Sequence, residues 1–160
     1  MQNNILIFIH LLAAAIGVGS SAYCVLLLLP ALEKKSPDKA RDETSVRYKA
    51  LDILAPAVFT AILILVGTGI IYLMENYTDQ VNLKPGYYNL FGIKMTSVVI
   101  VFFLSAYQTF GLRSRIANLD LRPENRKLVP HTLQQMTTFG KLILGFLVLT
   151  IFLGVCLSRL

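Results

Sequence analysis

The sequence predicts an all-α integral membrane protein, folded as an antiparallel bundle of four transmembrane helices. The chain has 160 residues, of which 55% are hydrophobic and only 15% charged, whereas a soluble domain is about a quarter charged. The apolar residues gather in four long blocks, and most charged residues lie between the blocks. The connectors are too short to hold a further domain, so residues 1–160 are expected to form a single four-helix domain.

Each apolar block is long enough to cross a hydrocarbon core, which requires roughly 20 helical residues. The blocks cover about residues 5–29, 53–74, 88–112 and 137–157. The first two contain no charged side chain, while the third includes Lys94 and the fourth includes Lys141. Unpaired backbone groups are too costly in lipid for an open structure, so all four blocks are expected to be α-helices.

Basic residues lie mostly on one side of the expected bundle. The first and third connectors together hold eleven Lys and Arg residues, whereas the remaining connector and the C-terminal segment hold only Lys84 and Arg159. Because cytoplasmic loops carry an excess of Lys and Arg, both termini are expected on the outer, periplasmic side. The net charge of +6 is then charge that flanks the membrane, and we expect the lipid bilayer, not nucleic acid, as partner.

His10 is an ionisable residue inside the first apolar block. Such a side chain is costly in lipid and marks a functional site by default. The other histidine, His131, precedes the fourth block, so the expected topology puts the two on opposite sides of the membrane and gives His131 no role. Cys24 and Cys156 lie inside apolar blocks and are interpreted as packing residues.

One face of the first block carries small residues next to His10. With spacings of three and four residues, this face contains Ala13, Ala14, Gly17, Ser20, Ser21 and Cys24. Two interpretations stay open from the sequence. The small residues allow close packing of a neighbouring helix, or they form a slot for a flat macrocycle beside the imidazole, in which Gly17 and Ser21 would contact the cofactor.

The third block carries a polar stripe with helical spacing. Its members are Lys94, Ser97, Val101, Ser105 and Gln108. A polar stripe in a membrane span is expected to face the bundle interior. Lys94 would either extend to the membrane surface or pair with an anionic group beside His10, such as a porphyrin propionate. Glu75 is the protein partner expected if no ligand is bound.

The stretch from His10 to Pro30 resembles the first helix of the HemJ-like and CopD-like small membrane proteins. Aligned from the histidine, the sequence keeps His10 and Tyr23 of the family pattern. It has Leu26 where the family has an arginine.

A second resemblance lies on the third block. Gly92-Ile93-Lys94, followed by Ala106-Tyr107-Gln108, is similar to the Ile-Lys and Ala-Tyr-His motifs of the family. The lysine is kept, and Gln108 replaces the second family histidine. The sequence is identified as a divergent member of this superfamily.

HemJ-type proteins are four-helix protoporphyrinogen oxidases that bind haem b, and the resemblance carries this expectation to the present chain. It implies a multi-pass protein of the bacterial inner membrane that binds haem or another tetrapyrrole, with His10 as the metal ligand. Lys94 would neutralise a propionate. A quinone or a respiratory partner would accept electrons, and whether the protein is itself an enzyme stays open.

Two other functions stay open. The end of the first block, Leu29–Leu32, looks more like the CopD-like members of the superfamily, which implies copper handling. Imidazole together with thioether ligands suits Cu(I). The candidate copper ligands are His10, Met1, Met74 and Met95. The third candidate is a non-catalytic accessory subunit of a larger membrane complex, in which His10 would only hydrogen-bond a neighbouring helix.

Overall fold

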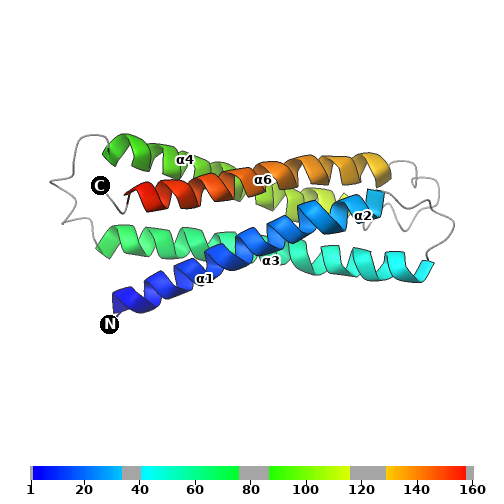
Figure 1. Ribbon diagram of the computed structural model, residues 1–160, viewed down its shortest axis with the longest axis horizontal. Coiled ribbons are helices and arrows are strands. Elements are labelled where there is room, and N and C mark those ends of the chain that lie inside the picture. The colour runs from blue at the N-terminus through cyan, green and yellow to red at the C-terminus, as the bar shows by residue number, and fades with distance from the viewer. Residues whose placement is uncertain (1, 34–40, 76–86, 116–128, 158–160) are drawn as a thin grey trace.

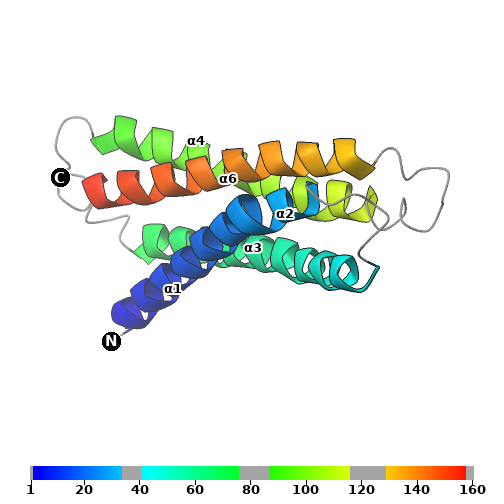
Figure 2. The ribbon, with the colours of Figure 1, turned by 45° about the vertical axis from the view of Figure 1, so that its right-hand side comes forward.

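Four helical rods lie side by side along the long axis of the molecule (Figure 1). The structure, a computed structural model, describes residues 2–33, 41–75, 87–115 and 129–157. The first rod consists of α1 (Gln2–Tyr23), a π-helical segment η1 (Cys24–Leu28) and α2 (Leu29–Glu33). The others are α3 (Arg41–Glu75), α4 (Tyr87–Ala106) with the π-helical segment η3 (Tyr107–Leu112), and α6 (Val129–Leu157). Successive rods run in opposite directions, so α1 begins where α6 ends (Figures 1 and 2).

Each rod contains a segment long and apolar enough to cross a membrane. These segments are Asn4–Leu32, Lys49–Met74, Tyr88–Arg115 and His131–Leu157. Large apolar side chains such as Phe8, Leu26, Phe103 and Phe152 are exposed on the outside of the bundle. Lipid tails accept such a surface, whereas water does not. The expected all-helical class and the four apolar spans are confirmed, and the chain is a multi-pass membrane protein.

Two helices are longer than the apolar blocks that predicted them. α3 begins at Arg41 and α6 begins at Val129, well before the expected starts at residues 53 and 137. Hydropathy measures the part of a helix that can lie in lipid, and polar residues can continue the same helix beyond it. Pro130 falls in the first turn of α6, where its missing N–H is not needed.

A proline lies within the first rod without ending it. Pro30 has no N–H and cannot bond the carbonyl four residues earlier. Immediately before it, the Leu29 N–H donates to the Cys24 carbonyl, five residues earlier, in the wider π-helical geometry. Such local adjustments let a helix continue through a proline. The same five-residue pattern recurs where the Arg113 N–H donates to the Gln108 carbonyl at the end of η3.

The core consists of two apolar clusters at different heights. One lies toward the end of the bundle where α2 ends and α6 begins, and contains Cys24, Leu28, Leu29, Leu32, Leu51, Leu112, Leu133 and Met136. The other lies nearer the middle and contains Val58, Ile62, Val101, Ile143 and Leu147. The buried residues of the first cluster come from all four rods and those of the second from α3, α4 and α6, so apolar packing joins the rods at both heights.

The rods associate mainly as two pairs, α1 with α3 and α4 with α6. A Cβ atom placed on Gly17 would lie 3.5 Å from the Cβ of Ala61 on α3, at van der Waals distance. Ala13 and Ala14 are also buried. Close packing of α3 therefore accounts for these small residues of the first span. Toward its N-terminal end, α1 diverges from α4 and α6 (Figures 1 and 2).

Candidate functional site

His10 is held by a side chain of the neighbouring helix. Its Nδ1 atom lies 2.7 Å from the Thr68 Oγ1 atom on α3. The Thr68 hydroxyl lies 2.6 Å from the Ile64 carbonyl oxygen of its own helix, to which it donates. A hydroxyl has one proton, so Thr68 accepts from His10 and the Nδ1 atom carries hydrogen. In the neutral imidazole, Nε2 then keeps its lone pair.

The surroundings of the imidazole differ between its two sides. Thr68 is buried and His10 is half-buried, so the hydrogen bond is largely shielded from the exterior. On α3, a Cβ atom placed on Gly69 would lie 3.9 Å from the His10 Cε1 atom. Cε1 is the ring atom between the two nitrogens. Because Gly69 has no side chain, residue 69 does not cover this edge of the imidazole ring.

Lys94 belongs to the same end of the bundle. Its side chain is half-buried and lies against α6, where a Cβ atom on Gly154 would be 3.5 Å from the Lys94 Nζ atom. The structure thus places His10 and Lys94 at the same end of the bundle, as the sequence analysis expected from their depth.

Among the side chains that the structure describes, no carboxylate is found paired with Lys94. Asp52, a described carboxylate, pairs with Arg113 at the opposite end of the bundle. The Glu75 side chain, the expected alternative partner, lies outside the described residues. Within the described residues, the ammonium of Lys94 therefore has no carboxylate partner that would compete with an anionic ligand at this end of the bundle.

Gly17 and Ser21 do not accompany His10 and Lys94. Helices α1 and α3 are antiparallel, so the contact of His10 with Thr68 is followed, seven residues along each helix, by the contact of Gly17 with Ala61. Ser21 lies further along and lines a small cavity. The face proposed as a slot for a macrocycle is thus covered by α3, and Gly17 packs on it.

The polar stripe of the third span faces inward, as predicted. Ser97, Val101, Ser105 and Gln108 are all buried. Gln108 lines the same cavity as Ser21. His131 is exposed at the start of α6, at the other end of the bundle from His10.

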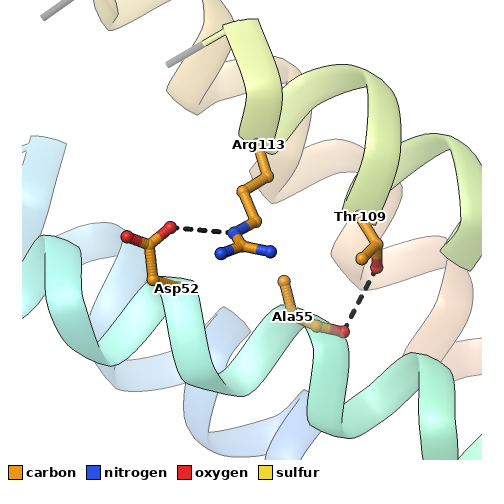
Figure 3. Close-up of polar contacts among 4 residues, drawn as sticks. All are labelled: Asp52, Ala55, Thr109 and Arg113. Atoms are coloured by element: carbon orange, nitrogen blue, oxygen red, sulfur yellow. Dashed lines mark hydrogen bonds and ion pairs between the residues drawn. The ribbon is translucent and has the colours of Figure 1, made fainter. Parts of the chain in front are cut away.

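Sequence reasoning missed the hydrogen bonds between the second and third rods. Figure 3 shows the Arg113 Nε atom donating to the Asp52 Oδ1 atom at 2.8 Å, and the Thr109 hydroxyl donating to the Ala55 carbonyl at 3.2 Å. Together they hold η3 against α3. Thr68 was also not identified from the sequence, although its register with His10 in antiparallel helices was a usable signal.

A metal site made by several protein ligands is not found in the described part of the chain. No group of three or more His, Cys, Asp or Glu residues lies close enough there to hold an ion. Of the expected copper ligands, Met74 has 75% of its surface exposed, and Met1 lies outside the described residues. His10 is consequently a candidate single ligand to a metal that brings its other ligands with it, as haem iron does.

Comparisons with protein-family models, with curated proteins and with solved structures found no match for this chain. The resemblance to the HemJ-like and CopD-like proteins therefore depends on a few short motifs. Of these, Tyr23 is exposed and Tyr107 packs on Phe139, with ring centroids 5.4 Å apart. His10 and Lys94 are the motif residues that lie at the same end of the bundle.

Proposed function

We propose that this protein binds haem b, or a related tetrapyrrole, with the His10 Nε2 atom as an axial ligand of the iron. The observation that carries the proposal is the hydrogen bond from His10 Nδ1 to Thr68 Oγ1. Metal-ligating histidines almost always donate their other ring N–H to a protein acceptor, which sets the tautomer and orients the ring. Here the acceptor is itself held by the Ile64 carbonyl.

Lys94 supports the anionic side of such a ligand. Haem carries two propionates, and a lysine ammonium is a compact partner for a carboxylate. Lys94 and His10 lie at the same end of the bundle, which would let one ligand use both groups. Gly154 contributes by leaving room for the lysine head on α6.

The donor set fits a haem with one protein ligand. Gln108 lines the interior cavity and His131 lies at the far end of the bundle, so neither would join His10 as a ligand of the same iron. Because α3 covers the small-residue face of α1, that face would not contribute to holding the group. The chemistry that the bound group supplies is one-electron redox chemistry, while the protein binds and orients it.

The wider proposal follows the family resemblance. The protein would reside in the bacterial inner membrane with both termini on the periplasmic side. Oxidation of protoporphyrinogen to protoporphyrin would remove electrons and protons in successive pairs, and each pair would reduce one quinone molecule to a quinol. The chain's own part in that reaction is to hold the tetrapyrrole through His10 and Lys94.

The test is an absorbance spectrum of the protein purified in mild detergent after expression with ample haem. We expect a Soret band, its loss in His10→Ala, and its retention in the matched control His131→Ala. Absence of the band from the parent protein, or a band of equal strength in His10→Ala, would overturn the proposal.

A second candidate is a non-catalytic accessory subunit of a larger membrane complex. One observation favours it: the bond between His10 and Thr68 joins α1 to α3, and a buried histidine can have this structural role alone. In that case His10→Gln retains function and the protein co-purifies with a large assembly. The absorbance spectrum separates this candidate from the first, because a structural His10 gives no Soret band.

A further inference from the structure

A small cavity with a mainly apolar lining and a few polar side chains lies inside the bundle, away from His10. Its volume is about 20 Å³. It is lined from all four rods, and its polar lining residues are Ser21, Cys24, Ser105, Gln108 and Thr109. Two of the walls are π-helical segments, since Cys24 belongs to η1 and Thr109 to η3. Such segments occur frequently at functional sites.

Ser21 is the unusual side chain of this cavity. It is only 4% exposed, and its Oγ atom is buried without a hydrogen-bond partner. Several other hydroxyls in the described helices donate to a carbonyl three or four residues earlier in their own helix, as Ser97 does to Ile93 and Thr137 to Leu133. An unpaired buried hydroxyl is costly, so the geometry of Ser21 requires a partner that is not a protein atom.

The neighbouring polar groups have capacity for the same partner. Ser105 and Thr109 donate their hydroxyl protons to the Phe102 and Ala55 carbonyls, and their oxygens can still accept. Gln108 is 8% exposed and presents an amide to the cavity. The site therefore offers donors and acceptors together.

We propose that this cavity binds one water molecule, which hydrogen-bonds to Ser21 and to the polar groups of α4 and η3. A cavity needs at least about 10–15 Å³ and two to four polar partners to hold a water. The volume meets the first condition, and the lining residues Ser21, Ser105 and Gln108 are the candidate partners for the second. The volume admits one such molecule and excludes any organic ligand. No carboxylate lines the cavity, which favours a neutral occupant over a cation.

The bound water connects helices that are otherwise joined mainly by apolar contacts. Ser21 is on the first rod, and Ser105 and Gln108 are on the third. A bridging water is enthalpically nearly as good as a direct hydrogen bond. This inference is independent of haem binding at His10.

The sign of the change in Tm caused by Ser21→Ala tests the inference. If Ser21 bonds a water, the substitution removes that bond and lowers Tm by about 2–4 °C. If the cavity is dry, the same substitution removes an unpaired buried hydroxyl and raises Tm. Ser20→Ala is the matched control, because Ser20 is the adjacent serine and does not line the cavity.

A structure in lipid at a resolution that shows ordered water provides the direct measurement. We expect a density peak about 2.5–3.2 Å from the Ser21 Oγ atom, and its loss in Ser21→Ala. An unchanged or raised Tm in Ser21→Ala, or no peak in the parent protein, overturns the inference. A Tm that rises with Na⁺ relative to choline, and does so only when Ser21 is present, overturns it in favour of a cation site.

Discussion

At the scale of single residues, the hydroxyl of Thr68 decides which nitrogen of His10 is available. Thr68 lies 2.6 Å from the Ile64 carbonyl and 3.2 Å from the Leu65 carbonyl, so its proton is used within α3. Its oxygen then accepts from Nδ1, and the imidazole is both oriented and set in one tautomer. Thr68 therefore acts on any ligand of His10 without touching it.

Thr68→Val removes the acceptor and keeps the shape of the side chain. We expect haem affinity to fall by about 10–100-fold, the usual effect of losing the hydrogen-bond partner of a metal-ligating histidine. Titration of the purified protein with haem measures it. Thr68→Ser, which keeps the hydroxyl, should retain most of the affinity.

Thr60→Val is the matched control for this substitution, since Thr60 is exposed on the same helix. Equal affinities of Thr68→Val and Thr60→Val would show that Thr68 does not position His10 for a ligand.

At the scale of helices, close approach depends on particular glycines. A Cβ atom on Gly140 of α6 would lie 2.7 Å from the Val25 Cγ2 atom of η1, a distance that real Cβ atoms do not adopt. Helix α6 can pack against the π-helical segment only because residue 140 has no side chain. Gly145, on the same helix, has nothing within 4 Å of its Cβ position.

Gly140→Ala should destabilise the bundle by about 1–3 kcal/mol, the usual cost of overpacking. Gly145→Ala gains the same helix propensity without the clash, so the free energy of unfolding should be unchanged or higher. Reversible unfolding of both variants in detergent measures the difference. A similar stability of the two variants would mean that η1 moves away at little cost.

At the scale of the whole molecule, the bundle has two chemically different ends. His10 and Lys94 lie at the end where α1 begins and α6 ends, while Asp52, Arg113 and the exposed His131 lie at the other. Most of the basic connector residues lie within 34–40 and 116–128, outside the described residues, but their number follows from the sequence. The excess of basic residues predicts that the His10 end faces the periplasm.

Cysteine labelling tests this orientation. In a background with Cys24 and Cys156 replaced by serine, Asn82→Cys should react with a membrane-impermeant maleimide added to intact cells. Ser36→Cys should react only after the membrane is permeabilised. The reverse pattern would place His10 on the cytoplasmic side and contradict the proposed topology.

The four spans could be predicted from the sequence because the length of an apolar run relative to the bilayer is a local property of the chain. The inward direction of Ser97, Ser105 and Gln108 followed in the same way from helical spacing. Helix starts were less predictable, and α3 begins at Arg41, because polar residues can extend a helix beyond the membrane without raising hydropathy.

The sequence by itself thus determined an all-helical membrane bundle and the rare ionisable residues inside it, His10 and Lys94. Only the tertiary structure decided that Thr68 holds His10, that Gly17 packs on Ala61, and that Ser21 lines a cavity. These contacts depend on the register and rotation of antiparallel helices. Interhelical side-chain packing sets both, and the partners are distant in the chain.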